Sequence, residues 1–264
     1  MTPDKKINRI VILGGGSAGW LTAGVIAAEH QAQDNESNTS AGLQITLIES
    51  PMISTIGVGE GTWPSMKSSL KKIGISETDL ITRCDASFKQ GTLFHNWMGT
   101  EGDSYTHPFT VPHGYAETNL APQWRNSGKK VPFAEAVSAQ NSLMFSNLAP
   151  KQITTPEYAF NANYGYHLDA AKFAELLKAH CVKKLNVLHL SAEVININSS
   201  PDGDIASLST DVVGDVEGDL FIDCSGSRAL LLGDHFGVPL CSKSQFLFND
   251  TALASQVAYD KVDD

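Results

Sequence analysis

Two stretches of the chain combine residue types and spacings that could do chemistry. The first is "GGGSAGW" (14–20), a glycine turn between an apolar run and a segment with helical apolar spacing. Glycines let a backbone approach a ligand closely, and the N–H groups at a helix start attract phosphate. The second is "CDASFKQGTLFHNW" (84–97), in which Lys89 stands alone in an alternating, aromatic-rich run. Lys89 is either an ordinary solvated side chain or an amine held in place for chemistry.

The glycine turn stands in the sequence order typical of dinucleotide binding. The predicted elements are a buried strand, a helix, a polar surface loop and a second buried strand, at 7–13, 17–30, 31–42 and 43–50. In this pattern Gly14 permits the tight turn, Gly16 lets N–H groups approach a pyrophosphate, and Gly19 lets the helix pack close to the strand. Glu49 ends the second strand, where it could accept hydrogen bonds from ribose hydroxyls. The alternative is a glycine turn that only packs.

A second glycine-rich loop, "PMISTIGVGEGTWPS" (51–65), precedes a predicted helix near 64–73. It lacks the strand–turn–helix context of a second nucleotide fold, so we do not expect direct binding of NAD(P)H. Its glycines favour a loop laid over a cofactor, although a surface loop remains the alternative.

The last hundred residues predict a return to the first strand. A helix over 168–185 leads into a strand over 186–198, which pairs across "SPDGD" with "IASLSTDV" (205–212). The run "GDLFIDCSG" (218–226) then reads as a buried strand, and "SRALLLGDHF" (227–236) opens a helix. A second strand–glycine–helix unit of this kind is typical of flavin hydroxylases.

We therefore predict an α/β protein with a Rossmann-like FAD-binding fold of the flavin monooxygenase type and a large mixed insertion. Residues 1–61 and 167–264 form the predicted FAD-binding domain, and 62–166 form the insertion that carries Lys89.

Composition excludes several classes of protein. The chain has 264 residues, 42% of them hydrophobic, and a formal net charge of −10, which argues against nucleic acid and against a polybasic membrane patch. No run approaches the roughly 18 apolar residues of a membrane span. The four cysteines are far apart, which predicts reduced thiols in a cytoplasmic protein. The histidines show no metal-ligand spacing, so we expect no metal site.

Five motifs together resemble the flavin-dependent tryptophan halogenases. They are "GGGSAGW", "IGVGEGTWP", "CDASFKQGTLFHNW", "YHLDAAKFAELL" and "FIDCSGSRALLLG". The resemblance runs from residue 7 to about 258, with matching order and approximate spacing. The glycine loop and the lysine strand are its more specific parts.

The resemblance implies a mechanism and a cofactor. Reduced FAD, supplied by a separate flavin reductase, reacts with O2 to a flavin hydroperoxide, and halide attacks it to give hypohalous acid. This acid travels to a lysine beside the substrate indole; that lysine falls on Lys89, the predicted catalytic residue. Aromatic burial by Phe88, Phe94 and Trp97 would lower the pKa of its amine. The predicted cofactor-binding residues are Gly14, Gly16, Ala18, Gly19, Glu49, Ser50, Ile53, Ile56, Gly57, Val58, Glu60, Gly61, Val194 and Asp223.

The chain departs from the family in three ways. Gly61 stands where the family commonly has alanine, in the strap laid over the flavin. The family's tryptophan-rich signature does not occur here, and the second catalytic residue, a glutamate, lies with the halide site in the half that this chain lacks. We therefore expect a truncated chain that halogenates tryptophan or another indole only as part of a longer protein. An FAD monooxygenase and a non-catalytic flavin-binding remnant stay open as alternatives, as do the ring position, the halide and a homodimeric state.

Overall fold

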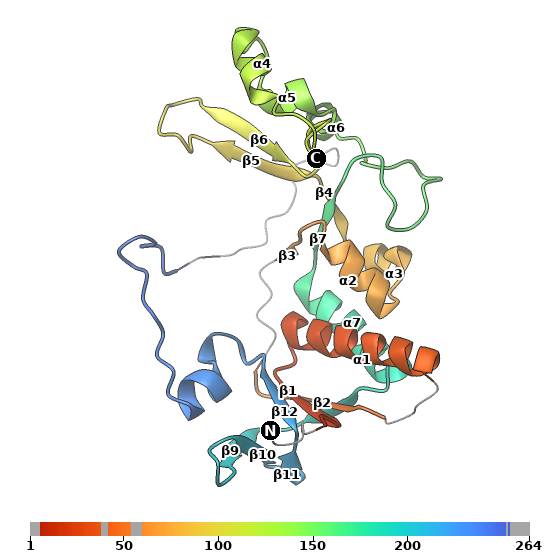
Figure 1. The fold of residues 1–264 in the computed structure, drawn as a ribbon, viewed down its shortest axis with the longest axis vertical. Helices are drawn as coiled ribbons and strands as arrows, with labels where there is room; N and C mark the ends of the chain where they lie inside the picture. Colours follow the sequence, from red (N-terminus) through yellow and green to blue (C-terminus); the bar gives the residue numbers. More distant parts are fainter. Residues whose placement is uncertain (1–5, 38–41, 54–59, 252, 254–264) are drawn as a thin grey trace. The chain divides into compact units, whose positions relative to one another are not determined.

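The computed structural model describes residues 6–37, 42–53, 60–251 and 253. The chain divides into two compact units (Figure 1). Unit 1 comprises Met1–Val58 and Ala174–Asp264, and unit 2 comprises Gly59–Phe173. The predicted division into domains at residues 61–62 and 166–167 stays a prediction.

Unit 1 is built on a parallel sheet with the strand order β12-β1-β2-β8. Its strands are β1 (Arg9–Leu13), β2 (Gln44–Glu49), β8 (Leu188–Ser191) and β12 (Leu220–Asp223). Leu13 pairs with Ile48 of β2 on one side and with Asp223 of β12 on the other. The predicted return of the late strand to the first strand is therefore confirmed, and the carboxyl ends of β1, β2 and β12 meet at one edge.

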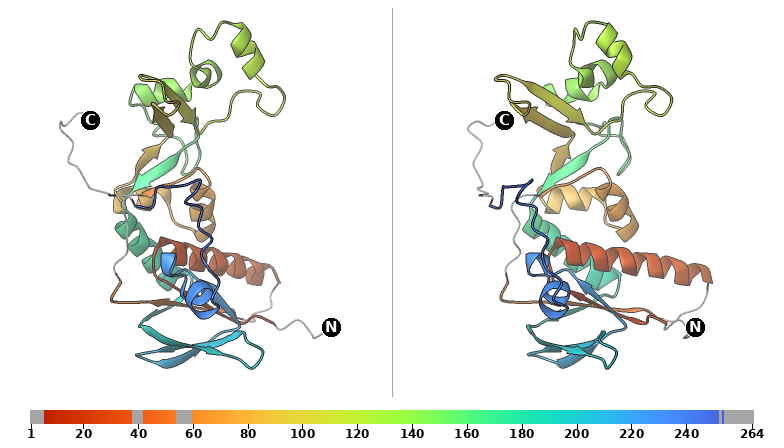
Figure 2. Two further views of the ribbon diagram at one scale, coloured as in Figure 1. Left: turned by 90° about the vertical axis from the view of Figure 1, so that its left-hand side faces the viewer. Right: turned by 60° about the vertical axis from the view of Figure 1, so that its left-hand side comes forward.

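Both faces of this sheet are covered, which explains why its strands are nearly continuous apolar runs. Helix α1 (Ser17–Ser37) lies on one face, and a second sheet lies on the other (Figure 2). The second sheet is antiparallel, with β9 (Val194–Ser199), β10 (Ile205–Thr210) and β11 (Gly214–Glu217) in the order β11-β10-β9. Val11 and Leu13 point toward it and pack with Leu208 and Leu231 in a buried cluster. The predicted hairpin between β9 and β10 is confirmed.

Unit 2 contains two smaller sheets. The first has the order β3-β7-β4, with β3 (Glu60–Gly61), β4 (Ser87–Lys89) and β7 (Gly165–Leu168). The second is the hairpin of β5 (Gly91–His95) and β6 (Ser104–Pro108). The helices of this unit are α2 (Met66–Ile73), α3 (Glu77–Arg83), α4 (Ala121–Asn126), α5 (Phe133–Val137) and α6 (Gln140–Phe145). Helix α7 (Ala170–Lys184) follows β7 and continues into unit 1.

Three predicted elements differ in detail from the structure. Helix α1 runs to Ser37, through much of the stretch expected to be a loop, because residues 31–37 contain few helix breakers. The strand expected over 186–198 is two strands, β8 and β9. The helix expected over 227–236 is a short 3-10 turn (η1, Gly226–Arg228) and a π-helical turn (η2, Leu230–His235), separated by Ala229 with φ 45°.

Within the described residues, no helix is long and apolar enough to span a bilayer. The same residues contain no cluster of three or more His, Cys, Asp or Glu side chains that could hold a metal ion. All four cysteines are free thiols.

Candidate functional site

The glycine turn after β1 is shaped by two glycines that cannot carry a side chain. Gly14 has φ 118°, and a Cβ on it would lie 2.2 Å from the Cys224 carbonyl oxygen. A Cβ on Gly19 would lie 1.9 Å from the carbonyl oxygen of Gly14. The same Cβ would lie 3.5 Å from Leu47 Cδ1 of β2, so helix α1 and the sheet approach each other closely at Gly19. Both residues therefore fold the turn and need no ligand to explain them.

Gly16 is different, because a Cβ there would meet nothing within 4 Å. The position is open, although the turn around it is tightly packed. Helix α1 begins at the next residue, and the N–H of Trp20 bonds to the Gly16 carbonyl in its first turn. Ala18 is exposed at this helix start. An open backbone beside the N-terminus of a long helix fits the pyrophosphate of a dinucleotide.

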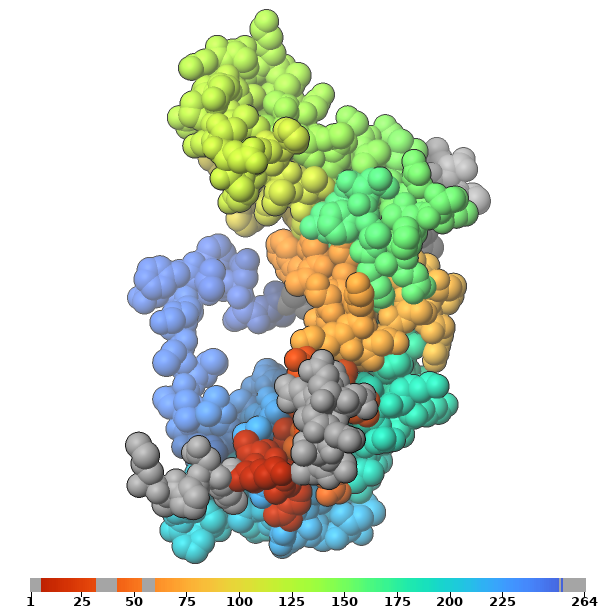
Figure 3. Space-filling view, turned by 45° about the vertical axis from the view of Figure 1, so that its right-hand side comes forward, coloured from red at the N-terminus to blue at the C-terminus, as the bar shows by residue number. Residues whose placement is uncertain are grey.

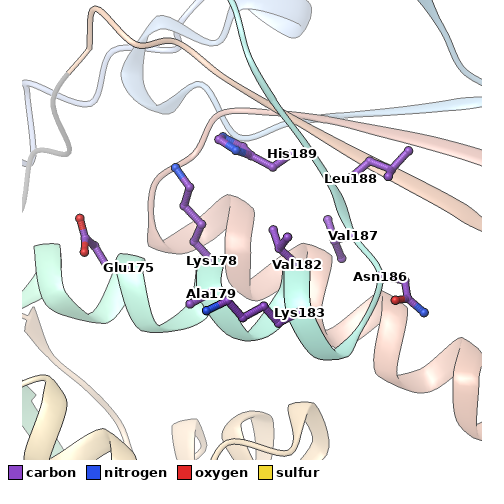
Figure 4. Close-up of a pocket in the computed structure, with 9 residues that line it drawn as sticks. All are labelled: Glu175, Lys178, Ala179, Val182, Lys183, Asn186, Val187, Leu188 and His189. Carbon is purple, nitrogen blue, oxygen red and sulfur yellow. The ribbon is translucent and has the colours of Figure 1, made fainter.

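Glu49 ends β2 at the same sheet edge, and its carboxylate is held from two other elements. Lys178 Nζ of α7 and His189 Nε2 of β8 each lie 2.8 Å from Glu49 Oε2. Figure 4 shows Lys178 and His189 pointing toward one another beside a cavity of about 680 Å³ between α7 and β8. Burial and the Lys178 charge lower the pKa of His189, against the opposing pull of Glu49. Sequence patterns do not predict this cluster, because Lys178 and His189 lie more than a hundred residues after Glu49.

The other predicted cofactor contacts of unit 1 have visible local partners. The Asp223 carboxylate accepts bonds from Ser225 N and Oγ and from the backbone N–H groups of Leu231 and Leu232. Burial opposes its charge, but these donors outweigh burial and lower the pKa of Asp223. It thus fixes the start of η2.

Val194 packs against the core cluster between the two sheets, and Ser50 bonds through its hydroxyl to Glu193. Ile53 is exposed after β2. Ile56, Gly57 and Val58 lie outside the described residues. For all of these, contact with a cofactor stays a prediction.

Lys89 is the last residue of β4 and is half-buried. Strand alternation places Phe88 on the opposite face, where its ring packs 4.9 Å from that of Tyr164. On the Lys89 face, Nζ lies 5.6 Å from the centre of the Trp63 ring and 5.7 Å from that of Phe109. The aromatic neighbours are therefore not the expected ones.

Phe94 and Trp97, which we expected around Lys89, pack elsewhere. Phe94 lies on β5 and stacks on Tyr105 of β6, with Trp97 against its edge. The sequence 84–97 alternates throughout, yet it forms strands in two different sheets, with the change at Gln90.

Two further residues of the three-stranded sheet surround the Lys89 amine. Gly61 of β3 and Ser87 of β4 both pair with His167 of β7. A Cβ on Gly61 would lie 3.0 Å from Lys89 Nζ and 3.6 Å from His167 Nδ1. Burial and the Lys89 charge lower the pKa of His167, which favours a neutral ring at neutral pH. The predicted cofactor contact Glu60 is exposed beside Gly61.

An aromatic cavity of about 550 Å³ lies in unit 2. Trp63 and Phe109, the two rings nearest to the Lys89 amine, both line it, and their centres are 5.4 Å apart. Tyr105, Tyr115 and Phe133 add further aromatic surface. Apolar, ring-lined walls with one amine beside them suit a flat aromatic molecule. Sequence analysis missed Trp63 and Phe109, since only strand pairing brings them to Lys89.

Comparison with known proteins shows to which family this fold belongs. The family model for tryptophan halogenase matches residues 9–263. The chain belongs to the tryptophan halogenase family.

The chain is similar to curated and solved members of this family. It is 31% identical over 272 residues to tryptophan 7-halogenase RebH of Lentzea aerocolonigenes, covering 97% of this chain and 49% of that protein. It is 51% identical to a crystallised tryptophan halogenase from Shewanella frigidimarina, with a TM-score of 0.85 over 93% of this chain and 48% of that one. A tryptophan C-6 flavin-dependent halogenase from taromycin biosynthesis is 28% identical, with a TM-score of 0.81 over 92% and 48%.

These comparisons confirm the predicted family and the Rossmann-like fold class. The chain spans about half the length of the curated relatives it matches.

Proposed function

We propose that this chain carries the FAD-binding and lysine-bearing parts of an enzyme that halogenates tryptophan or another indole. The observation that supports this most is the position of the Lys89 amine within 6 Å of two rings that line an aromatic cavity. The glycine turn and Glu49 of unit 1 supply the features that a dinucleotide needs. Gly16 and Ala18 would lie against its pyrophosphate, and Glu49 would accept from its ribose.

When bound and reduced, FAD supplies the electrons with which O2 is activated for halide oxidation. The residues of this chain then act on the resulting hypohalous acid. In one route the neutral Lys89 amine attacks the halogen, so that an N–halogen bond forms, the O–halogen bond breaks, and the oxygen leaves as water with the amine's proton. The indole carbon next attacks the halogen, the N–halogen electrons return to nitrogen, and nitrogen takes up a proton as the ring loses one, which restores the neutral amine.

In the other route the Lys89 ammonium donates a hydrogen bond to the hypohalous oxygen while the indole attacks the halogen directly. Both routes need the amine beside the ring, and both need a closed site, because an oxidant open to solvent would diffuse away before it reaches the indole. Trp63 and Phe109 would hold the indole face and exclude water from the Lys89 amine.

The co-substrates and partners belong to the same proposal. We expect O2 and halide as co-substrates and a separate flavin reductase as the source of reduced FAD, as the resemblance to flavin-dependent halogenases implies. The free cysteines fit a protein of the reducing cytoplasm.

The test compares variants of Lys89, made in a protein of the relatives' full length, in an assay with flavin reductase, FAD, bromide and tryptophan or indole. Lys89→Ala should lower halogenated product by at least about 100-fold, the contribution of a positioned proton donor or nucleophile, and leave flavin reoxidation by O2 unchanged. Lys89→Arg keeps a donor but no nucleophilic amine, so it separates the two routes. Lys71→Ala, on the exposed side of α2, is the control. Product at the parental rate in Lys89→Ala would remove Lys89 from the mechanism, and indole hydroxylation without halide would favour a monooxygenase.

A further inference from the structure

The Glu49 carboxylate is contacted by two side chains within unit 1, and both come from outside the dinucleotide motif. We propose that Lys178 and His189 are positioning residues that hold Glu49 for the ribose of the cofactor. This inference rests on the proposed function, since it assumes that FAD binds at the glycine turn.

The two oxygens of the Glu49 carboxylate have different neighbours. Oε2 lies 2.8 Å from both Lys178 Nζ and His189 Nε2. Oε1 lies over the glycine turn, 2.5 Å from the point that a Cβ on Gly15 would occupy. Gly15, the middle glycine of "GGG", therefore has no room for a side chain, because the Glu49 side chain packs against it. Oε2 accepts a hydrogen bond from Lys178 of α7 and lies in close contact with His189 of β8, whose buried Nε2 makes no hydrogen bond of good geometry among the described residues. Oε1 faces the turn where the cofactor is expected.

Of the two contacting groups, His189 is itself held by packing, whereas the Lys178 side chain is 40% exposed. His189 stands on β8, paired with Leu47 of β2, and its ring packs 5.5 Å from that of the fully buried Trp20 on α1. The side chains of Glu49 and His189 are 23% and 20% exposed, so water screens their contact less than it would screen a surface ion pair. Lys178 also offsets the negative charge of Glu49, which would otherwise repel the pyrophosphate of FAD.

The helix that carries Lys178 offers a matched control. Lys183 lies on α7, lines the same cavity and is exposed. Among the described residues it forms no ion pair with a carboxylate. Lys178→Met and Lys183→Met therefore remove the same charge from one helix, but only Lys178→Met releases Glu49.

The experiment measures FAD affinity of the 264-residue chain by flavin fluorescence titration, with circular dichroism to verify folding. Lys178→Met should raise Kd about tenfold, the loss expected for one charge-assisted hydrogen bond. Lys178→Arg should restore most of the affinity, His189→Gln should raise Kd severalfold, and Lys183→Met should stay within about twofold of the parent.

Gly16→Val separates failure of this inference from failure of the proposed function. Its side chain would enter the open space beside the turn, so the variant should fold and lose FAD. If Gly16→Val loses FAD while Lys178→Met behaves like Lys183→Met, the positioning role is overturned and the FAD site stands. If Gly16→Val binds FAD like the parent, or if the folded parent binds none, the FAD site itself is wrong.

Discussion

Gly61 of the predicted strap lies beside the predicted catalytic amine of Lys89. Gly61 lies on β3 and Lys89 on β4, with His167 of β7 between the two strands. At this position the resemblance leads us to expect alanine. Because Gly61 has no methyl group, the Lys89 amine has free space on that side. A Cβ on Gly61 would lie 3.0 Å from Lys89 Nζ.

Gly61→Ala should therefore push the Lys89 amine away and shield it. We expect the rate at which formaldehyde and a borohydride methylate Lys89 to fall severalfold, because the methyl group covers one approach to the nitrogen. Peptide mass spectrometry measures this rate without any turnover, and Lys71 serves as an internal reference in the same sample. Equal methylation rates of Lys89 in the parent and in the variant would show that Gly61 does not control access to the amine.

At the residue scale, the sequence identified groups whose role depends on near neighbours. The glycine turn and Glu49 belong to one strand–helix–strand segment, so their spacing carries the prediction. The rings around Lys89 belong to other segments of the chain. Trp63 precedes α2 and Phe109 follows β6, so neither is near Lys89 in sequence. The alternation of side chains predicts on which face of β4 the Lys89 side chain lies. The residues next to it on that face are determined by the pairing of β4 with other strands.

At the element scale, the alternating run over residues 84–97 predicts one continuous strand, but the structure divides it at Gln90 into β4 and β5. The hairpin β5–β6 approaches so closely that a Cβ on Gly91 would lie 2.6 Å from the His107 carbonyl oxygen. The backbone N–H of Phe109 bonds to the Gln90 carbonyl, so pairing with the β6 side of the hairpin begins at Gln90, directly after β4 ends at Lys89. Alternation at period two continues through such a turn, so the sequence predicts strand content correctly and sheet membership not at all.

Helix α3 is attached to β7 through one buried acid, Glu77. Its carboxylate accepts bonds from Lys151 Nζ, from the hydroxyls of Tyr164 and Tyr166, and from the Tyr158 N–H. Burial alone would raise its pKa, but the four donors outweigh burial and hold the pKa of Glu77 below its usual range. A group with a depressed folded pKa stabilises the fold above its unfolded pKa, about 4.3, and this stability is lost as pH falls through the folded pKa.

Glu77→Gln should destabilise unit 2 at pH 7 by about 3–5 kcal/mol, because Lys151 is left as a buried charge without its carboxylate. The difference from the parent should shrink as pH falls below about 4, where the parent loses the same charge. Thermal unfolding followed from pH 3 to 8 measures both effects. Glu135→Gln, an exposed acid on α5, is the control and should leave Tm nearly unchanged. A constant difference across this pH range would mean that the Glu77 charge contributes nothing.

At the scale of the whole molecule, unit 1 is assembled from two segments separated by all of unit 2. The buried strand pattern predicted this closure, because β1 and β12 are both apolar on two faces and each needs parallel neighbours. The course of the chain after η2 had no such pattern to predict it. Figure 3 shows residues 237–250, in blue, leaving the packed part of their unit as a narrow extended path.

This segment exposes large apolar side chains to solvent. Leu240 is 97% exposed, Phe246 74% and Phe248 83%. Several large apolar side chains exposed along one short segment promote association. We therefore expect the 264-residue chain to self-associate as its concentration rises, despite a net charge of −10 that favours monomers.

Replacing Phe246 and Phe248 together by serine should shift the chain toward monomer and lower its binding of an apolar dye. Sedimentation velocity over a range of concentrations measures the first effect, and dye fluorescence measures the second. The matched control is Val212→Ser with Val213→Ser, two exposed apolar residues in the tight turn between β10 and β11, flanked in sequence by Asp211 and Gly214. This control should associate like the parent. Association that persists in the phenylalanine variant, or that disappears equally in the valine variant, would show that the segment after η2 does not drive it.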